Sequence, residues 1–82
     1  MAFPDSVVVE AWQRSVGCCE CTRSTCGHVG RHGVRLVLAA RGNDKVLGGW
    51  EAHHITAGGQ DVASNCEILC QPCHKKTQTF GG

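Results

Sequence analysis

Large aromatic side chains are scarce in this chain of 82 residues, which has no Tyr, two Phe and two Trp. It also lacks any run of about 18 apolar residues, the length needed to span a membrane. The length allows one small domain, and a domain of this size buries only about 60% of its unfolded surface. Because few aromatic residues can anchor a core, we expect a metal, disulfides or a partner to stabilise the fold.

An excess of one charge sign is lacking as well, since eight Lys and Arg stand against seven Asp and Glu, a formal net charge of +1. Domains that bind nucleic acid usually carry a strongly basic surface, so composition alone argues against such a partner. Contact with a polyanion would depend on where a few cations lie: Arg23, Arg31, Arg35, Arg41, Lys45, Lys75 and Lys76.

A secretory signal is also missing from the start of the chain, "MAFPDSVVVEAWQRS", which has no basic region and no long apolar run. The chain has seven cysteines, and an odd number argues against a closed disulfide framework. We therefore expect reduced thiols and a cytoplasmic location, where clustered Cys and His residues indicate zinc.

Apolar spacing and turn residues predict a small α+β fold with short elements. A helix is expected over residues 4–16, followed by a ligand-rich loop over 18–33. Residues 34–40 and 46–55 predict two strands joined as a hairpin through the turn "RGND". The rest predicts a Gly-rich loop over 56–65, a brief returning strand at "CEIL", and a helix from Gln71 or Pro72 to about Gln78.

The cysteines have the spacing of zinc ligands. Cys70-x-x-Cys73 predicts a zinc knuckle, because two thiolates on one tight turn chelate a tetrahedral ion, and Cys66 could add a third thiolate. With Cys18 set aside, eight candidates would fill two tetrahedral sites: Cys19, Cys21, Cys26, His28, His32, Cys66, Cys70 and Cys73. One zinc with spare thiols is an open alternative, as is a plain surface-loop role for His28 and His32.

Three further histidines call for a different explanation. His53 and His54 are adjacent and end a predicted strand, so their side chains should point to opposite faces. One imidazole could then bind a metal while the other accepts a proton from water. His74 follows Cys73 directly at the start of the predicted second helix, where a neighbouring zinc would fix its direction.

The ordered pieces "AHHI", Gly58-Gly59, Asn65 and "LCQPCHKK" resemble the motif of the HNH endonucleases, also called His-Me finger or ββα-metal nucleases. The resemblance is close over residues 46–80 and loose over the N-terminal helix and first knuckle. It implies one HNH domain over residues 1–82, zinc-stapled, with a β-hairpin, an Ω-like loop and a helix, preceded by an N-terminal helix.

The resemblance also implies an activity, that of a DNA endonuclease that hydrolyses phosphodiester bonds with a divalent metal. In this family pattern His54 is the general base, and Asn65 steadies the loop and so orients that base. His53 and His74 would hold one catalytic ion, while Lys75, Lys76 or Arg31 could contact phosphates. Because two imidazoles suit Mn²⁺, Ni²⁺ or Zn²⁺ better than Mg²⁺, we expect Mn²⁺ or Ni²⁺ to support activity at least as well as Mg²⁺.

A weaker resemblance concerns the ligand-rich loop. Its Cys and His spacing is similar to one zinc site of the His-Cys box homing endonucleases, which implies a site made of Cys19, Cys26, His28 and His32. The second zinc would then lie between Cys21, Cys66, Cys70 and Cys73, although Cys19 and Cys21 could trade places.

The biological setting is left open by the sequence. Small domains of this kind resemble the free-standing HNH proteins of bacteria and their phages, which implies a monomer or homodimer, in some cases within a larger phage or restriction assembly. Two alternatives remain: a non-catalytic zinc module that binds nucleic acid or protein, in which the three histidines form another zinc cluster, and a secreted toxin-type nuclease.

Overall fold

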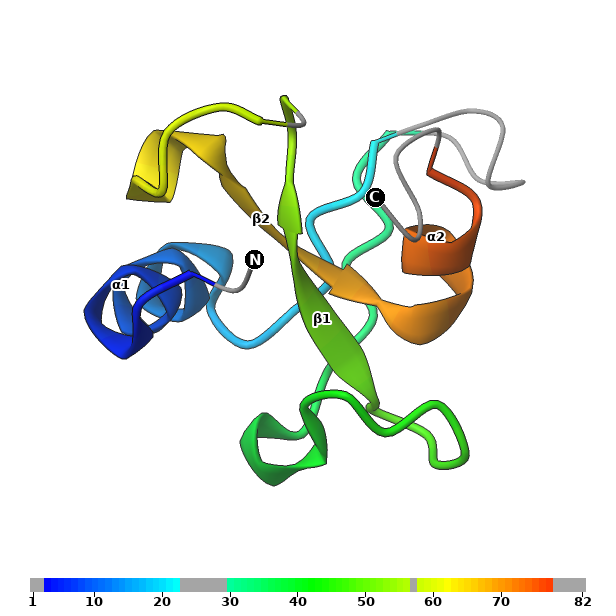
Figure 1. The fold of residues 1–82 in the computed structure, drawn as a ribbon. Coiled ribbons are helices and arrows are strands. Elements are labelled where there is room, and N and C mark those ends of the chain that lie inside the picture. The colour runs from blue at the N-terminus through cyan, green and yellow to red at the C-terminus, as the bar shows by residue number, and fades with distance from the viewer. Residues whose placement is uncertain (1–2, 23–29, 57, 78–82) are drawn as a thin grey trace.

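The structure is a computed structural model, and it describes residues 3–22, 30–56 and 58–77. The elements, in chain order, are α1 (Asp5–Ser15), η2 (Leu38–Ala40), β1 (Trp50–His54), η3 (Ala63–Asn65), β2 (Cys66–Cys70) and α2 (Gln71–Lys75) (Figure 1). Neither α-helix in these ranges has the length and apolar character that a bilayer crossing demands.

The two strands form an antiparallel sheet at the centre of the molecule, with α1 and α2 on opposite sides of it (Figure 1). In the register of the sheet, Trp50 lies opposite Cys70 and His54 lies opposite Cys66. Helix α2 follows β2 without a connecting residue. The unit of β1, β2 and α2, together with a Cys and His cluster, therefore confirms the expected small α+β fold of the ββα-metal type.

The predicted pairing of strands was wrong. Residues 34–40 form only one isolated bridge, between Arg35 and Cys18, and then turn into η2. Leu36 and Ala40 are buried, but Val34, Val37 and Leu38 are exposed at 42%, 53% and 61%, so the segment does not present the alternating buried face of a paired strand. The partner of β1 is the returning strand β2, whose Ile68 and Leu69 are fully buried.

The helices lie where the sequence predicted them, with shorter ends. Helix α1 ends at Ser15, and the next residue, Val16, adopts a left-handed conformation with φ 57°. Helix α2 has Pro72 in its first turn, as predicted, but ends at Lys75, before the expected end near residue 78. Backbone N–H groups of Lys76 and Thr77 donate to the carbonyls of Cys73 and His74 and close this short helix.

Cysteine side chains make up much of the core. Trp50, Ile68 and Leu69 are its largest fully buried residues, and Ala11 packs from the α1 side. Around them lie five buried cysteines: Cys19, Cys21, Cys66, Cys70 and Cys73. None of the six cysteines in the described ranges forms a disulfide. The thiols thus fill the interior that the missing aromatic residues would otherwise occupy.

Candidate metal centre and candidate active site

Four side chains from three separate parts of the chain converge on one point. The ligand atoms of Cys19, His32, Cys70 and Cys73 all lie within 4.8 Å of one another. His32 Nδ1 is 3.4 Å from the sulfur of Cys73 and 3.6 Å from that of Cys70. Three thiols and one imidazole are a donor set of tetrahedral structural zinc sites, so this group could hold such an ion.

Backbone hydrogen bonds hold these ligands in place. The N–H of Cys19 donates to the carbonyl of Val34, and the N–H of His32 donates to that of Cys21, so residues 19–21 and 32–34 run side by side. The N–H of Cys70 donates to the sulfur of Cys19 over 3.3 Å. The end of β2 and the start of α2 are thereby fastened to the N-terminal half of the chain.

The three thiols of the group differ in how readily they ionise. A hydrogen bond between the Cys19 and Cys70 thiols lowers the pKa of Cys70 and raises the pKa of Cys19. Burial raises the pKa of Cys73. Without a cation only one sulfur readily carries negative charge, whereas a bound divalent ion would let the others ionise as well.

This group mixes the two ligand sets expected from the sequence. Cys19 and His32 do come together, but with Cys70 and Cys73, which were expected in the other set. Cys21 is fully buried and hydrogen-bonds with the thiol of Cys73, next to the group. Cys66 is buried outside the group, where desolvation raises its pKa to about 11. The remaining candidates, Cys26 and His28, lie outside the described residues.

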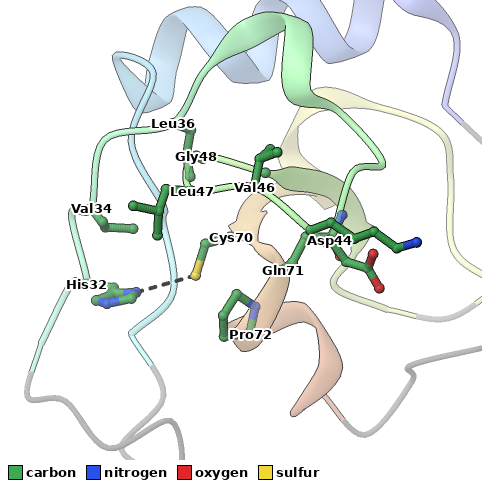
Figure 2. Close-up of a pocket in the computed structure, with 12 residues that line it drawn as sticks. His32, Val34, Leu36, Asp44, Val46, Leu47, Gly48, Cys70, Gln71 and Pro72 are labelled. Atoms are coloured by element: carbon green, nitrogen blue, oxygen red, sulfur yellow. Dashed lines mark hydrogen bonds between the residues drawn. The ribbon is translucent and has the colours of Figure 1, made fainter.

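A pocket of 390 Å³ borders the exposed side of this group (Figure 2). His32 and Cys70 form one part of its wall, next to Pro72. The rest is mainly aliphatic and includes Val34, Leu36, Val46 and Leu47. Asp44, Lys45 and Gln71 complete the polar part of the lining, but the histidine pair does not contribute to it, so the candidate hydrolytic site lies elsewhere.

The adjacent histidines point to opposite faces of β1, as the alternation of a strand predicts. His53 is buried, and its ring meets that of His74 edge-on, with centroids 5.4 Å apart and an angle of 70° between the rings. Burial lowers the pKa of His74, which favours the neutral, metal-binding form. These two imidazoles lie in contact between β1 and α2, where they could offer nitrogen ligands to an ion.

His54 has two partners that sequence reasoning missed. Its Nε2 lies 2.7 Å from Oδ1 of Asp61, and its ring stacks on Phe3 with centroids 3.8 Å apart and an interplanar angle of 15°. The His54 side chain is 22% exposed, so water can reach it. Asp61 follows His54 by seven residues, within the Gly-rich loop, and Phe3 comes from the N-terminal segment, so no local motif marks either contact.

Asn65 closes the loop between β1 and β2 with both ends of its side-chain amide. Its Oδ1 accepts from the Thr56 N–H over 2.8 Å, and its Nδ2 donates to the Gln60 carbonyl over 3.0 Å. Gly59 leaves room for this arrangement, since a Cβ there would lie 2.8 Å from Nδ2 of Asn65. Asn65 and Gly59 of the sequence motif therefore act together to hold the loop between Thr56 and Asn65 in one conformation, and we call this set of contacts the loop lock.

The three residues predicted to contact phosphate differ in how far protein groups already engage their side chains. Lys75 pairs with Asp44 over 3.2 Å at the surface, and Lys76 is exposed. The guanidinium of Arg31 donates to the carbonyls of Ser15 and Cys19, which ties it to the fold of the metal group. Of the three, Lys76 is the most available for a phosphate.

Residues 41–80 match the family model described as HNH endonuclease. This segment is an HNH domain. The match contains β1, β2 and α2, and so includes the histidine pair, the loop lock of Asn65 and the Cys70–Cys73 knuckle. No curated protein and no solved structure matches the chain. The match thus assigns residues 41–80 to the family, while the candidate ligands Cys19 and His32 come from outside the matched segment.

Proposed function

We propose that this protein is a metal-dependent DNA endonuclease that hydrolyses phosphodiester bonds. The observation that carries the proposal is that the side chains of His53 and His54 point in opposite directions within an HNH domain. One imidazole turns inward toward His74, and the other turns to a solvent-accessible position beside the Asn65 loop. This separates a metal-binding histidine from a proton-accepting one on neighbouring residues.

Each side chain then has a distinct part in hydrolysis. His54 accepts the proton of the attacking water, a role that suits an imidazole at neutral pH. His53 and His74 would hold a divalent cation, which when bound would neutralise charge on the phosphate and stabilise the 3′-oxygen leaving group. Asn65 keeps the loop beside His54 in one conformation.

Zinc in the group of Cys19, His32, Cys70 and Cys73 would act as a brace, not as a catalyst. It would fix the start of α2, and with it the direction of His74, which directly follows a ligand. A second structural zinc remains our expectation from the number of ligands. We expect elemental analysis to give two zinc ions per chain, and a value of one would exclude the second site.

We further propose that the protein acts on DNA in the cytoplasm as a monomer or homodimer. The near-neutral net charge supports dependence on a larger assembly for tight DNA binding. A non-catalytic zinc module is the second candidate, because the ligand group of Cys19, His32, Cys70 and Cys73 contains none of the three histidines of the candidate active site. Such a module would bind DNA or protein without cutting it.

Plasmid nicking by the zinc-loaded full chain and by His54→Ala tests the proposal. Losing the general base should lower the nicking rate roughly 10²- to 10⁴-fold. Zinc content and the circular dichroism spectrum should not change, because His54 does not belong to the four-residue group. Mn²⁺ or Ni²⁺ should support nicking at least as well as Mg²⁺. If His54→Ala nicks as fast as the wild type, the nuclease mechanism is wrong.

A further inference from the structure

The imidazole of His54 is held at its edge and on its face. The edge contact is the 2.7 Å approach of Nε2 to Oδ1 of Asp61, and the face contact is the stacked ring of Phe3, which is only 4% exposed. A ring restrained in both ways keeps one orientation, because rotation about either side-chain torsion would break a contact.

The edge contact also determines which nitrogen carries the proton. An ionised carboxylate can only accept hydrogen bonds, whereas a neutral imidazole has one N–H donor and one lone pair. A close contact between Nε2 and Asp61 therefore requires the proton on Nε2. The lone pair is then on Nδ1, which becomes the atom able to accept a proton from water.

Asn65 fixes the position of the carboxylate through the loop. Its Nδ2 donates to the carbonyl of Gln60, the residue before Asp61, and the absence of a side chain at Gly59 lets that amide approach. The contacts therefore run in an unbroken series from Asn65 to Gln60, and from Asp61 to His54. Through these contacts Asn65 can influence the orientation of His54, although the two residues lie on different elements.

We propose that Asp61 is a positioning residue that holds His54 in the Nε2–H tautomer and leaves Nδ1 as the proton acceptor. The inference rests on the proposed nuclease function and adds a residue to it. Asp61 does not touch the substrate in this scheme, and its effect passes through the imidazole. The same test can reveal an inhibitory role for Asp61. If Nε2 were the nitrogen that accepts the proton, the contact with Asp61 would block it.

The kinetic test compares Asp61→Asn, Asp61→Ala and Asp61→Glu with the wild type in plasmid nicking with Mn²⁺. Loss of the carboxylate should lower kcat roughly 10- to 100-fold, the usual effect of removing an orienting partner, with little change in KM. Asp61→Glu should restore much of the rate, because it keeps the acceptor. Asp44→Asn is the matched control, since Asp44 is a similarly exposed carboxylate that pairs with Lys75. It should change kcat less than about twofold.

A spectroscopic measurement tests the contact without relying on cleavage. The ¹⁵N shifts of His54 at about pH 8, where a histidine is ordinarily neutral, should report the Nε2–H tautomer in the wild type and a mixture in Asp61→Asn. A rise in kcat on removing the carboxylate, or an Nδ1–H tautomer in the wild type, would overturn the proposal. If no variant cuts DNA, the nuclease function fails, while the tautomer still decides whether Asp61 sets the proton position.

Discussion

At Gly59, one additional carbon atom would disturb the candidate active site. A Cβ there would lie 2.8 Å from Nδ2 of Asn65 and 2.9 Å from the Thr56 carbonyl, closer than side chains normally approach. Relief would require the Asn65 amide or the loop backbone to move. Because the same amide holds Gln60 next to Asp61, such a shift would also displace the carboxylate that contacts His54.

We therefore expect Gly59→Ala to lower the nicking rate more than Gly58→Ala does. Gly58 has φ 75° and open space around its Cβ position, so alanine there should cost about 1 kcal/mol of backbone strain without a clash. Thermal melting of both variants measures the stability cost, and nicking measures the effect on the site. Equal nicking rates would mean that the loop lock does not control the base.

At the residue scale, the sequence suggested candidate residues for the site, but it did not predict which side chains contact them. His53, His54, Asn65 and His74 follow from an ordered motif, because each has a typical residue type at a typical spacing. Asp61 and Phe3 could not be found in this way. Their contacts with His54 depend on how the loop folds and on where the N-terminal segment lies, and neither is encoded in a local pattern.

Among the elements, α1 is joined to the loop and to β2 through one guanidinium. Arg14 donates to both oxygens of Glu20, to the Ala63 carbonyl and to the Cys66 carbonyl, at distances of 2.6 to 2.9 Å. The hydrogen bond with Glu20 raises the pKa of Arg14. Ala63 begins η3, which carries Asn65, so the side chain links the N-terminal helix to the loop lock.

Arg14→Lys should destabilise the fold by about 1–2 kcal/mol, because an ammonium group cannot serve all four acceptors in their planar arrangement. The cost stays this small because the Arg14 side chain is 44% exposed and water screens its charge. Urea unfolding measures the change, with the exposed Arg35→Lys as the control. If both variants unfold at the same urea concentration, the guanidinium contacts contribute nothing measurable.

The failed strand prediction has a physical cause at the element scale. The run "VRLVLAA" has strand-like composition, but pairing is decided by which partner offers a buried face. At Gly48, φ is 85° and a Cβ would come within 2.7 Å of Val37 Cγ2, so the chain bends sharply just before β1. The hairpin expected through "RGND" is therefore replaced by pairing across the longer loop that contains Asp61 and Asn65.

At the scale of the whole molecule, the interior is too small to stabilise the fold by apolar burial alone. Three of its largest fully buried residues are Trp50, Ile68 and Leu69, and cysteines supply most of the remainder. A structural zinc site contributes on the order of 10 kcal/mol of folding free energy, as much as the net stability of a typical domain. Cysteine number and spacing predict such a dependence on zinc, but the grouping of the candidate ligands required the tertiary structure.

Substitutions of two buried cysteines can distinguish stabilisation by zinc from stabilisation by packing. Cys73→Ser removes a thiolate from the four-residue group, so it should lose bound zinc and the cooperative unfolding transition. Cys66→Ala removes an equally buried thiol outside that group and should retain the zinc held there, so any zinc that it does lose belongs to the expected second site. Zinc per chain, measured with circular dichroism melting, distinguishes the two. If Cys66→Ala retains no zinc at all, Cys66 is a ligand of that ion and the four-residue group does not describe its site.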